Sequence, residues 1–280
     1  MKFRRKPEWL QKKCNPGDQA GMRQLLGELQ LNTVCQQALC PNISECFGCG
    51  QVTFLILGRN CTRLCSFCNI EKTPPLAIDA EEPGRVAEAV TRLYLSHAVI
   101  TSPTRDDLPD GGAGLYAATV AAIRSASPDT KIELLIPDFK GEFENVKVVT
   151  SSKPHILGHN VETVPRLYHI RNGSDYRRSL DVLTMCMDLA PDARTKSGIM
   201  LGMGEVVEEV LQVFADLRTA GCSFLSIGQY LAPSRAHYPV QAYIQPEMFD
   251  VFRAEALKLG FSHVESGPYV RSSYHAGLYA

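Results

Sequence analysis

Three cysteines on one short segment are the first residues of this chain that could carry chemistry. The segment RNCTRLCSFCNI contains Cys61, Cys65 and Cys68, with three and then two residues between neighbours, directly after an apolar run. Three thiolates can bind three irons of a four-iron cluster, which leaves the fourth iron open for a reactant. Electron carriers close such clusters with four cysteines, so this loop predicts a reactive cluster. A zinc site, or cysteines that pack in a turn, are the alternatives.

A second set of three cysteines lies shortly before the first. The segment TVCQQALCPNISEC contains Cys35, Cys40 and Cys46, with four and then five residues between neighbours. This set predicts a second metal centre that is again one protein ligand short. Candidates for the missing ligand are Cys49, a substrate, or a residue far along the chain. The alternative is a structural zinc ion held by these three cysteines together with Cys49.

Composition narrows the class of protein in which these cysteines occur. The chain has 280 residues, ten of them cysteine, with a formal net charge of -1. Nearly balanced charge argues against a nucleic-acid-coating protein, and no apolar run is long enough for a membrane span. We expect no export signal, so clustered thiols indicate metal binding in a reducing cytoplasm rather than a disulfide scaffold. Cys14, Cys186 and Cys222 stand apart from both sets.

The elements that must position the cysteines follow from an alternation of apolar runs and amphipathic stretches. Runs without period-2 alternation are typical of strands buried on both faces of a parallel sheet. The predicted strands lie within 51–57, 95–101, 131–137, 155–160, 195–201 and 224–231. The predicted helices lie within 83–95, 115–126, 177–189, 204–221 and 246–259.

This order predicts an α/β fold with six β-then-α units. Polar residues follow the successive apolar runs, as at the active-site face of a barrel, whereas a doubly wound sheet would gather them at one switch point. We therefore predict an incomplete (β/α)6 TIM-type barrel over 51–260. Residues 1–50 form a predicted N-terminal extension with the second cysteine set, and 261–280 form a C-terminal segment.

The loop with Cys61, Cys65 and Cys68 resembles the signature of radical S-adenosylmethionine enzymes, including an aromatic residue, Phe67, before the third cysteine. The resemblance implies a four-iron cluster whose open iron chelates the methionine part of S-adenosylmethionine. One electron then cleaves the sulfonium and yields a 5′-deoxyadenosyl radical that abstracts hydrogen. Hydrogen-atom abstraction needs no general base, so no catalytic acid or base is predicted.

Taken with the second set, the chain resembles the lipoyl synthases over nearly its whole length. The matching segments are KPEWLQKK, TVCQQALCPN, ILGRNCTRLCSFCNI, TSPTRDDLPDGGA, IELLIPDFKG, GHNVETVPRLY, TKSGIMLGMGE, IGQYLAPSRAHYPV and SGPYVRSSYHA. The resemblance implies insertion of two sulfur atoms at C6 and C8 of a protein-bound octanoyl-lysine. A second, auxiliary four-iron cluster would be the sulfur donor and would be consumed.

The same resemblance implies the ligands of the auxiliary cluster. They are Cys35, Cys40, Cys46 and a serine of the RSSY motif, assigned to Ser273 with Ser272 as the neighbouring alternative. A hydroxyl is a harder and weaker ligand to iron than a thiolate, as suits a cluster that must release iron. Arg271 and Tyr274 would orient the serine. Cys49 departs from the family pattern and is close enough in sequence to compete as a ligand.

Contacts to S-adenosylmethionine are predicted at Phe67, Thr101, Asp107, Glu133, Asn160 and Lys196. The resemblance implies Thr101 and Asp107, which a helix cap with solvated charges explains equally well. Glu133 lies in an apolar run, and a buried carboxylate needs a partner such as a ribose hydroxyl or a neighbouring Lys or Arg. Asn160 and Lys196 lie at strand ends, where barrel enzymes bind ligands.

The implied partners are octanoylated lipoyl carrier domains, namely 2-oxoacid dehydrogenase E2 subunits and the glycine cleavage H protein, and an electron donor such as ferredoxin or flavodoxin. A basic arm that includes Lys2, Arg4, Lys6, Lys12 and Lys13 either meets an acidic carrier or is a solvated terminus. Two other functions stay open: a different radical S-adenosylmethionine sulfurtransferase or oxidoreductase, and a non-catalytic iron–sulfur or zinc-binding module.

Overall fold

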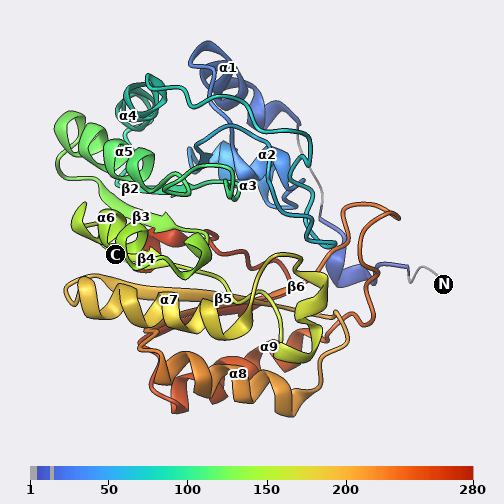
Figure 1. The fold of residues 1–280 in the computed structure, drawn as a ribbon. Coiled ribbons are helices and arrows are strands. Elements are labelled where there is room, and N and C mark those ends of the chain that lie inside the picture. The colour runs from blue at the N-terminus through green and yellow to red at the C-terminus, as the bar shows by residue number, and fades with distance from the viewer. Residues whose placement is uncertain (1–4, 13–15, 280) are drawn as a thin grey trace.

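The computed structural model describes residues 5–12 and 16–279, and its strands form one parallel sheet in the order β1 to β7 (Figure 1). Each strand pairs with the next along the chain, as right-handed crossovers of strand, helix and strand produce. The edges β1 and β7 do not pair, so the barrel is open on one side. The strands are β1 (Thr53–Leu55), β2 (His97–Thr101), β3 (Lys131–Leu135), β4 (Ile156–Gly158), β5 (Arg194–Leu201), β6 (Phe224–Gln229) and β7 (His263–Gly267).

A helix follows each of the first six strands, which confirms the six predicted units. These helices are α4 (Glu82–Arg92), α5 (Ala113–Ala126), α6 (Phe143–Ser151), α7 (Tyr176–Leu189), α8 (Val207–Thr219) and α9 (Pro246–Lys258). Helix α6 was not among the helical stretches predicted by residue. Strand β7 falls inside 261–280, so part of the predicted C-terminal segment belongs to the sheet.

The segment before β1 consists of short helices. They are the 3-10 turns η1 (Glu8–Leu10) and η2 (Pro16–Gln19), then α1 (Ala20–Glu28), α2 (Val34–Gln37) and α3 (Ile43–Gly48). Thr33 forms an antiparallel bridge with Phe54, and the Leu55 amide donates to the Asn32 carbonyl over 2.9 Å. These bonds fix the short helices against the first strand of the sheet.

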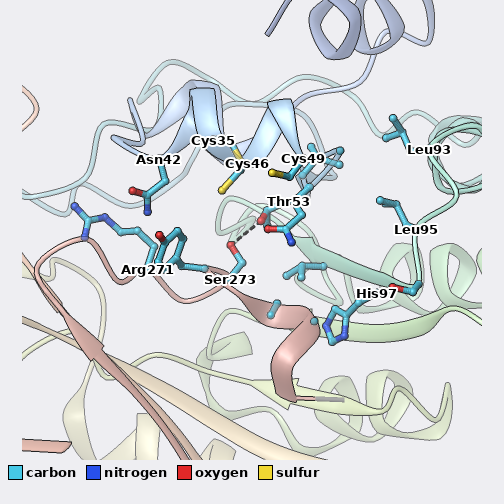
Figure 2. A pocket seen from close by; sticks show the side chains of 18 of the residues that line it. Cys35, Asn42, Cys46, Cys49, Thr53, Leu93, Leu95, His97, Arg271 and Ser273 are labelled. Atoms are coloured by element: carbon cyan, nitrogen blue, oxygen red, sulfur yellow. Dashed lines mark hydrogen bonds between the residues drawn. The ribbon is translucent and has the colours of Figure 1, made fainter. Parts of the chain in front are cut away.

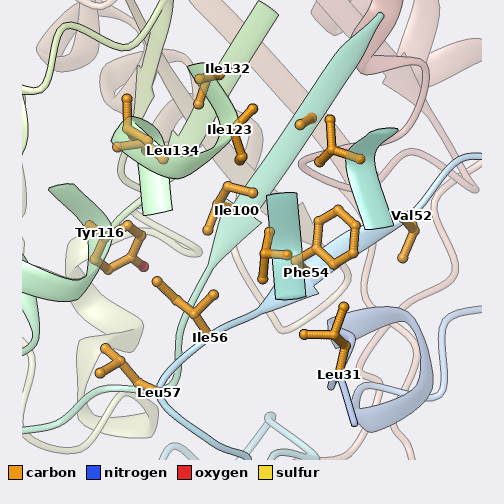
Figure 3. Packing of buried hydrophobic residues seen from close by; sticks show 14 of the residues in the cluster. Leu31, Val52, Phe54, Ile56, Leu57, Ile100, Tyr116, Ile123, Ile132 and Leu134 are labelled. Carbon is orange, nitrogen blue, oxygen red and sulfur yellow. The ribbon is translucent and has the colours of Figure 1, made fainter. Parts of the chain in front are cut away.

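The side of the sheet that faces the helices is apolar. Phe54, Ile100 and Leu134 lie in register on β1, β2 and β3 and are fully buried. Tyr116 and Ile123 of α5 pack in the same cluster (Figure 3). Burial of each such side chain contributes roughly 2 kcal/mol, so this layer holds the first three strands in place.

The interior side of the sheet carries both apolar and charged groups. Val99, Ile156 and Phe224 form a small buried cluster with Ala276 of the C-terminal turn η5 (Ala276–Tyr279). In β2 and β3, Val99 pairs in register with Glu133, so this carboxylate also points to the interior. The chain after β7 therefore returns into the open barrel.

The segments before β1 and after β7 are hydrogen-bonded to each other. The Asn42 side-chain amide donates to the Tyr269 carbonyl over 2.7 Å, and the Tyr274 hydroxyl donates to Glu45 Oε1 over 3.0 Å. Lys12 binds both Asn42 and Glu45 through its ammonium group. The predicted N-terminal and C-terminal extensions thus contact one another in the fold. None of the helices in the described part of the chain is long and apolar enough to cross a membrane.

Candidate iron–sulfur centres and the cavities between them

Cys61, Cys65 and Cys68 lie on the loop between β1 and α4. Backbone bonds tie this loop to later strand-end loops, from the Thr62 amide to the Thr104 carbonyl over 3.0 Å and from the Ser66 amide to the Ile170 carbonyl over 2.9 Å. The Arg63 amide also lies 3.4 Å from the Cys61 Sγ. The loop is therefore held at the carboxyl ends of the strands, where barrel active sites lie.

A buried ion network holds the same loop from within. The Arg63 guanidinium binds Asp106 with contacts of 2.7 and 3.0 Å and Asp138 with contacts of 2.9 and 2.6 Å. Arg178 reaches the same Asp138 carboxylate over 2.8 Å. Burial alone would raise the pKa of Asp138, but its bonds to Arg63 hold that pKa well below its ordinary value. A charged carboxylate thus anchors the arginine that stands between two of the cysteines.

The thiols of Cys65 and Cys68 would not ionise readily by themselves. Burial raises the pKa of Cys65 to about 11, which Arg171 opposes and Cys61 reinforces. Burial raises the pKa of Cys68 to about 12, with added repulsion from Cys65 and Cys61. Neighbouring thiols that repel one another as thiolates need a shared cation to lose their protons. The donor set therefore fits a cationic iron cluster.

The second set is built on α2 and α3. Cys35 lies in α2, whose N-terminus Thr33 caps, and Cys46 lies in α3. The Cys40 amide donates to the Cys35 carbonyl over 3.0 Å, which closes the turn between the two helices. Burial raises the pKa of Cys46 to about 12, with further repulsion from Cys40 and Cys35. This set has the same electrostatic need for a cation.

Ser273 faces the second set of cysteines (Figure 2). It lines a small cavity of about 210 Å³ together with Cys35, Cys40 and Cys46. The Thr53 hydroxyl of β1 donates to the Ser273 Oγ over 2.6 Å. The structure thus brings all four predicted auxiliary ligands to one cavity.

Ser272 points to a different partner from Ser273. The Asn160 side-chain amide donates to the Ser272 Oγ over 2.6 Å, and Ser272 lines a second, large cavity of about 450 Å³. The Ser272 side chain does not line the small cavity. Of the two serines, Ser273 is therefore better placed for the auxiliary set.

The large cavity connects the two sets of cysteines. Cys68 of the first set and Cys35 and Cys40 of the second set all line it. Gly228 on β6 lets the chain pass closely above the sheet, because a Cβ there would lie 2.1 Å from the Val270 carbonyl oxygen. This close passage brings the segment with the two serines into the cavity wall.

Phe67 and Asn160 line the large cavity, as do Glu162 and Tyr230, which the sequence analysis did not single out. The Asn160 amide donates to Glu162 Oε1 over 3.0 Å. Burial raises the pKa of Glu162, and the nearby Arg171 opposes that shift. The sequence feature that could have identified Glu162 is its position two residues after Asn160, shortly after the end of β4.

Four other predicted cofactor contacts are not among the residues that line either cavity. The Thr101 hydroxyl donates to the Leu135 carbonyl over 2.9 Å, and Asp107 pairs with Arg105 over 2.8 Å. Glu133 is buried, with Lys196 Nζ 2.7 Å from one carboxylate oxygen and His97 Nε2 3.1 Å from the other. Lys196 and His97 are therefore the protein partners of this carboxylate.

The two residues predicted to orient the serine differ in their surroundings. Arg271 lines both cavities, and burial lowers its pKa while Cys40 opposes that shift. Tyr274 lines the small cavity, but its hydroxyl bonds to Glu45. Arg271 is thus adjacent to the auxiliary cysteines, and Tyr274 holds the C-terminal segment against α3.

The other cysteines fall into separate classes. Cys49 is exposed and lines the small cavity beside Cys46 (Figure 2). Cys186 and Cys222 are buried in the hydrophobic core. Cys14 lies outside the described residues, as do Lys2, Arg4 and Lys13 of the basic arm. Within the described chain, no three His, Cys, Asp or Glu side chains are close enough to share one metal ion.

Comparison with known proteins places this chain in a family. The model of the Radical SAM superfamily matches residues 55–217. The chain is 67% identical to the lipoyl synthase of Trichlorobacter lovleyi over 100% of both chains, and 66% identical to that of Geotalea uraniireducens over 100% of this chain and 99% of the relative.

A solved structure supports the fold alone. The crystal structure of Streptococcus suis SuiB bound to S-adenosylmethionine superimposes with a TM-score of 0.59, at 10% identity, over 89% of this chain and 60% of that chain. Full-length identity at two thirds of positions is far above what a shared barrel fold alone would give. With the paired cysteine sets in place, the chain belongs to the lipoyl synthase family of the Radical SAM superfamily.

Proposed function

We propose that this chain inserts two sulfur atoms, at C6 and C8, into an octanoyl-lysine on a lipoyl carrier domain. The observation that carries the proposal is the large cavity, whose wall includes cysteines of both sets. A substrate chain held there lies between the site that generates radicals and the site that supplies sulfur. Membership of the lipoyl synthase family supports the same reaction.

Cys61, Cys65 and Cys68 are the proposed ligands of the radical cluster. When bound, that cluster supplies the electron that cleaves S-adenosylmethionine. Phe67 and Asn160 line the cavity where the cofactor would bind, and Glu162 adds a carboxylate beside Asn160. The cofactor contacts predicted for Thr101, Asp107, Glu133 and Lys196 stay predictions.

Cys35, Cys40, Cys46 and Ser273 are the proposed ligands of the auxiliary cluster, the consumed sulfur donor. Thr53 donates a hydrogen bond to the Ser273 oxygen and so orients it toward the thiols. Arg271, which lines both cavities, places positive charge beside the cysteines. We propose that 1–50 and 261–280 complete this site around 51–260, with β7 of the second segment extending the sheet.

Much of the large cavity wall is apolar, and we propose that it binds the octanoyl chain. Val34, Ala38 and Leu39 contribute from α2 and the turn after it, and Ile199 and Met200 contribute from β5. An apolar wall excludes water and binds methylene groups at roughly 0.8 kcal/mol each. Such a wall holds an unreactive alkyl chain beside the cysteines of both sets.

We propose that the carriers are E2 subunits of 2-oxoacid dehydrogenases and the H protein of glycine cleavage, and that ferredoxin or flavodoxin supplies electrons. We also propose that the protein works in the cytoplasm, where a reducing environment keeps thiols available to iron. The family supports a protein-bound octanoyl substrate, and these particular partners extend that statement.

One anaerobic single turnover tests the function. Reconstituted protein, reductant, S-adenosylmethionine and an octanoyl-lysine carrier are combined and read by mass spectrometry. We expect 5′-deoxyadenosine together with a carrier that has gained two sulfur atoms. Cys46→Ala should still form deoxyadenosine but add no complete pair of sulfurs, and Cys68→Ala should form neither product.

Two results would contradict the proposal. Deoxyadenosine without sulfur gain, from protein with both clusters, would assign another substrate to the radical chemistry. If neither deoxyadenosine nor a sulfur-containing carrier formed, the result would contradict an enzymatic function and favour a non-catalytic binding module.

A further inference from the structure

The auxiliary ligands lie in the wall between the two cavities. Cys35, Cys40 and Ser273 line both of them, whereas Cys46 lines only the small cavity and Cys68 lines only the large one. A cluster on these ligands would therefore have two faces. One face meets the cavity of the substrate, and the other meets a separate space.

Apart from the residues that the two cavities share, the small cavity is lined by segments that do not line the large one. These segments are the turn after α3, the residues from Leu93 to His97 at the start of β2, and Ala276 and Gly277 of η5 (Figure 2). Cys49, Tyr94 and Ser96 on its rim are exposed, and Tyr94 is 92% exposed. The small cavity thus reaches solvent by its own opening.

A buried group in this cavity also has an unused bonding site. His97 lines the cavity, its side chain is only 5% exposed, and its Nε2 contacts Glu133. Its Nδ1 is buried and has no hydrogen-bond partner in the described structure. Buried polar atoms of this kind usually have a partner, so the cavity is suited to polar or charged guests.

If the proposed function holds, the auxiliary cluster must be replaced after each turnover. At that moment the large cavity contains the carrier's modified chain and the cleaved cofactor. We propose that the small cavity is the entry through which iron and sulfide return to Cys35, Cys40, Cys46 and Ser273. Two ferrous ions, two ferric ions and four sulfides rebuild the core without a further oxidant, and the ligand protons pass to solvent.

A matched pair of substitutions tests this entry. Ser96→Trp fills the rim of the small cavity, and Ser262→Trp adds the same bulk at another exposed serine directly before a strand. The first readout needs no cluster. Cluster-free protein is treated with N-ethylmaleimide, and the alkylation rates of Cys46 and Cys68 are compared by mass spectrometry.

We expect Ser96→Trp to slow alkylation of Cys46 by roughly tenfold, because packed side chains leave little room for a reagent to pass. Alkylation of Cys68, which faces the other cavity, should not change. Ser262→Trp should change neither rate. Wild-type alkylation of Cys46 in Ser96→Trp would overturn the proposal.

The second readout follows the rebuilding itself. Fully loaded protein completes one turnover, and ferrous and ferric iron with sulfide are then added. We expect Ser96→Trp to match wild type in the first turnover but to regain iron and sulfide several-fold more slowly. Rebuilding at the wild-type rate would show that the atoms enter by the large cavity.

The two proposals fail in different ways. A wild-type protein that adds no sulfur in its first turnover contradicts the proposed function, while the alkylation rates still report access. If Ser96→Trp folds poorly, Gly277→Phe narrows the same cavity from the C-terminal wall, where an added Cβ meets no atom within 4 Å. The same alkylation ratio then decides the question.

Discussion

The Ser273 hydroxyl is the only oxygen among the four proposed auxiliary ligands. Oxygen binds iron less tightly than thiolate does in soft, sulfur-rich sites. We therefore expect the iron bound by Ser273 to be lost first. The short bond from Thr53 keeps the oxygen in place while the cluster is intact. We therefore expect this one residue to set how readily the proposed sulfur donor loses iron.

Replacing Ser273 by Cys should give an auxiliary cluster that binds well but donates poorly. We expect Ser273→Cys to retain its iron yet insert sulfur at least roughly tenfold more slowly, because a thiolate holds the iron more firmly. Ser273→Ala should lose iron from the auxiliary site. Iron analysis and single-turnover yield measure the two effects.

Two neighbours serve as controls for this prediction. Ser272→Ala should keep its auxiliary iron, because that hydroxyl bonds to Asn160 instead. Cys49→Ala should insert sulfur normally in the first turnover if Ser273 is the ligand. Loss of auxiliary iron in Cys49→Ala, with none lost in Ser273→Ala, would move the fourth ligand to Cys49.

Individual residues also show what the sequence could and could not predict. The grouping of the cysteines into two sets could be predicted from their spacing, and the structure brings Cys35, Cys40 and Cys46 to one cavity. The ion-pair partner of Glu133 could not be predicted, because Lys196 lies on β5, two strands away from β3. Only folding brings the two side chains together. Glu162 was missed because a lone carboxylate after a strand looks like an ordinary solvated residue.

At the scale of elements, the cysteine loop depends on the ion network around Arg63. The Arg63 side chain is 5% exposed and Asp138 is fully buried, so removing the guanidinium leaves a buried charge short of a partner. We expect Arg63→Ala to lower the free energy of unfolding by about 3–5 kcal/mol. Iron retention on the loop should fall as well.

Arg59 on the same loop provides the comparison. Its contact with Glu71, at 3.2 Å, is largely exposed, so Arg59→Ala should cost no more than about 1 kcal/mol. Arg63→Lys should fall between the two, since an ammonium keeps the charge but cannot bind both carboxylates in the same way. Urea unfolding measures all three; equal effects of the two alanine variants would contradict the anchoring role.

The elements were predicted unevenly for physical reasons. The first six strands read as apolar runs because both of their faces are covered. Strand β7 has the sequence HVESG, in which only Val264 is buried, so no apolar run marks it. Helix α6 is short and rich in β-branched valine, which weakens its helical pattern.

At the scale of the whole molecule, the barrel interior contains a buried charged pair. Glu133 and Lys196 are 2% and 3% exposed, and they join β3 to β5 across β4. Lys196→Met alone should destabilise the fold by about 3–5 kcal/mol, because it removes the cationic partner of a buried carboxylate. Adding Glu133→Gln, which keeps the contact with His97, should recover most of that loss.

The same pair of variants also tests the predicted cofactor contacts. Equilibrium unfolding gives the stability, and binding of S-adenosylmethionine to loaded protein gives the affinity. If the pair only supports the barrel, the double variant should bind the cofactor as wild type does. A large loss of affinity in a stable double variant would instead support direct cofactor contact by these residues.

The return of the chain into the barrel after β7 affects the order in which the two cluster sites are completed during synthesis. Ser273 and Ala276 are translated after every strand of the sheet, whereas Cys61, Cys65 and Cys68 emerge together near its beginning. On the ribosome, the three proposed radical ligands therefore all emerge before β2, and their loop gains its anchors once Asp106, Asp138 and Arg178 follow. The proposed auxiliary site must wait for nearly the whole chain, because a nascent or prematurely terminated protein has its three thiols but lacks Ser273. Only a chain that has been translated past Ser273 can bind the complete sulfur-donating cluster that we propose.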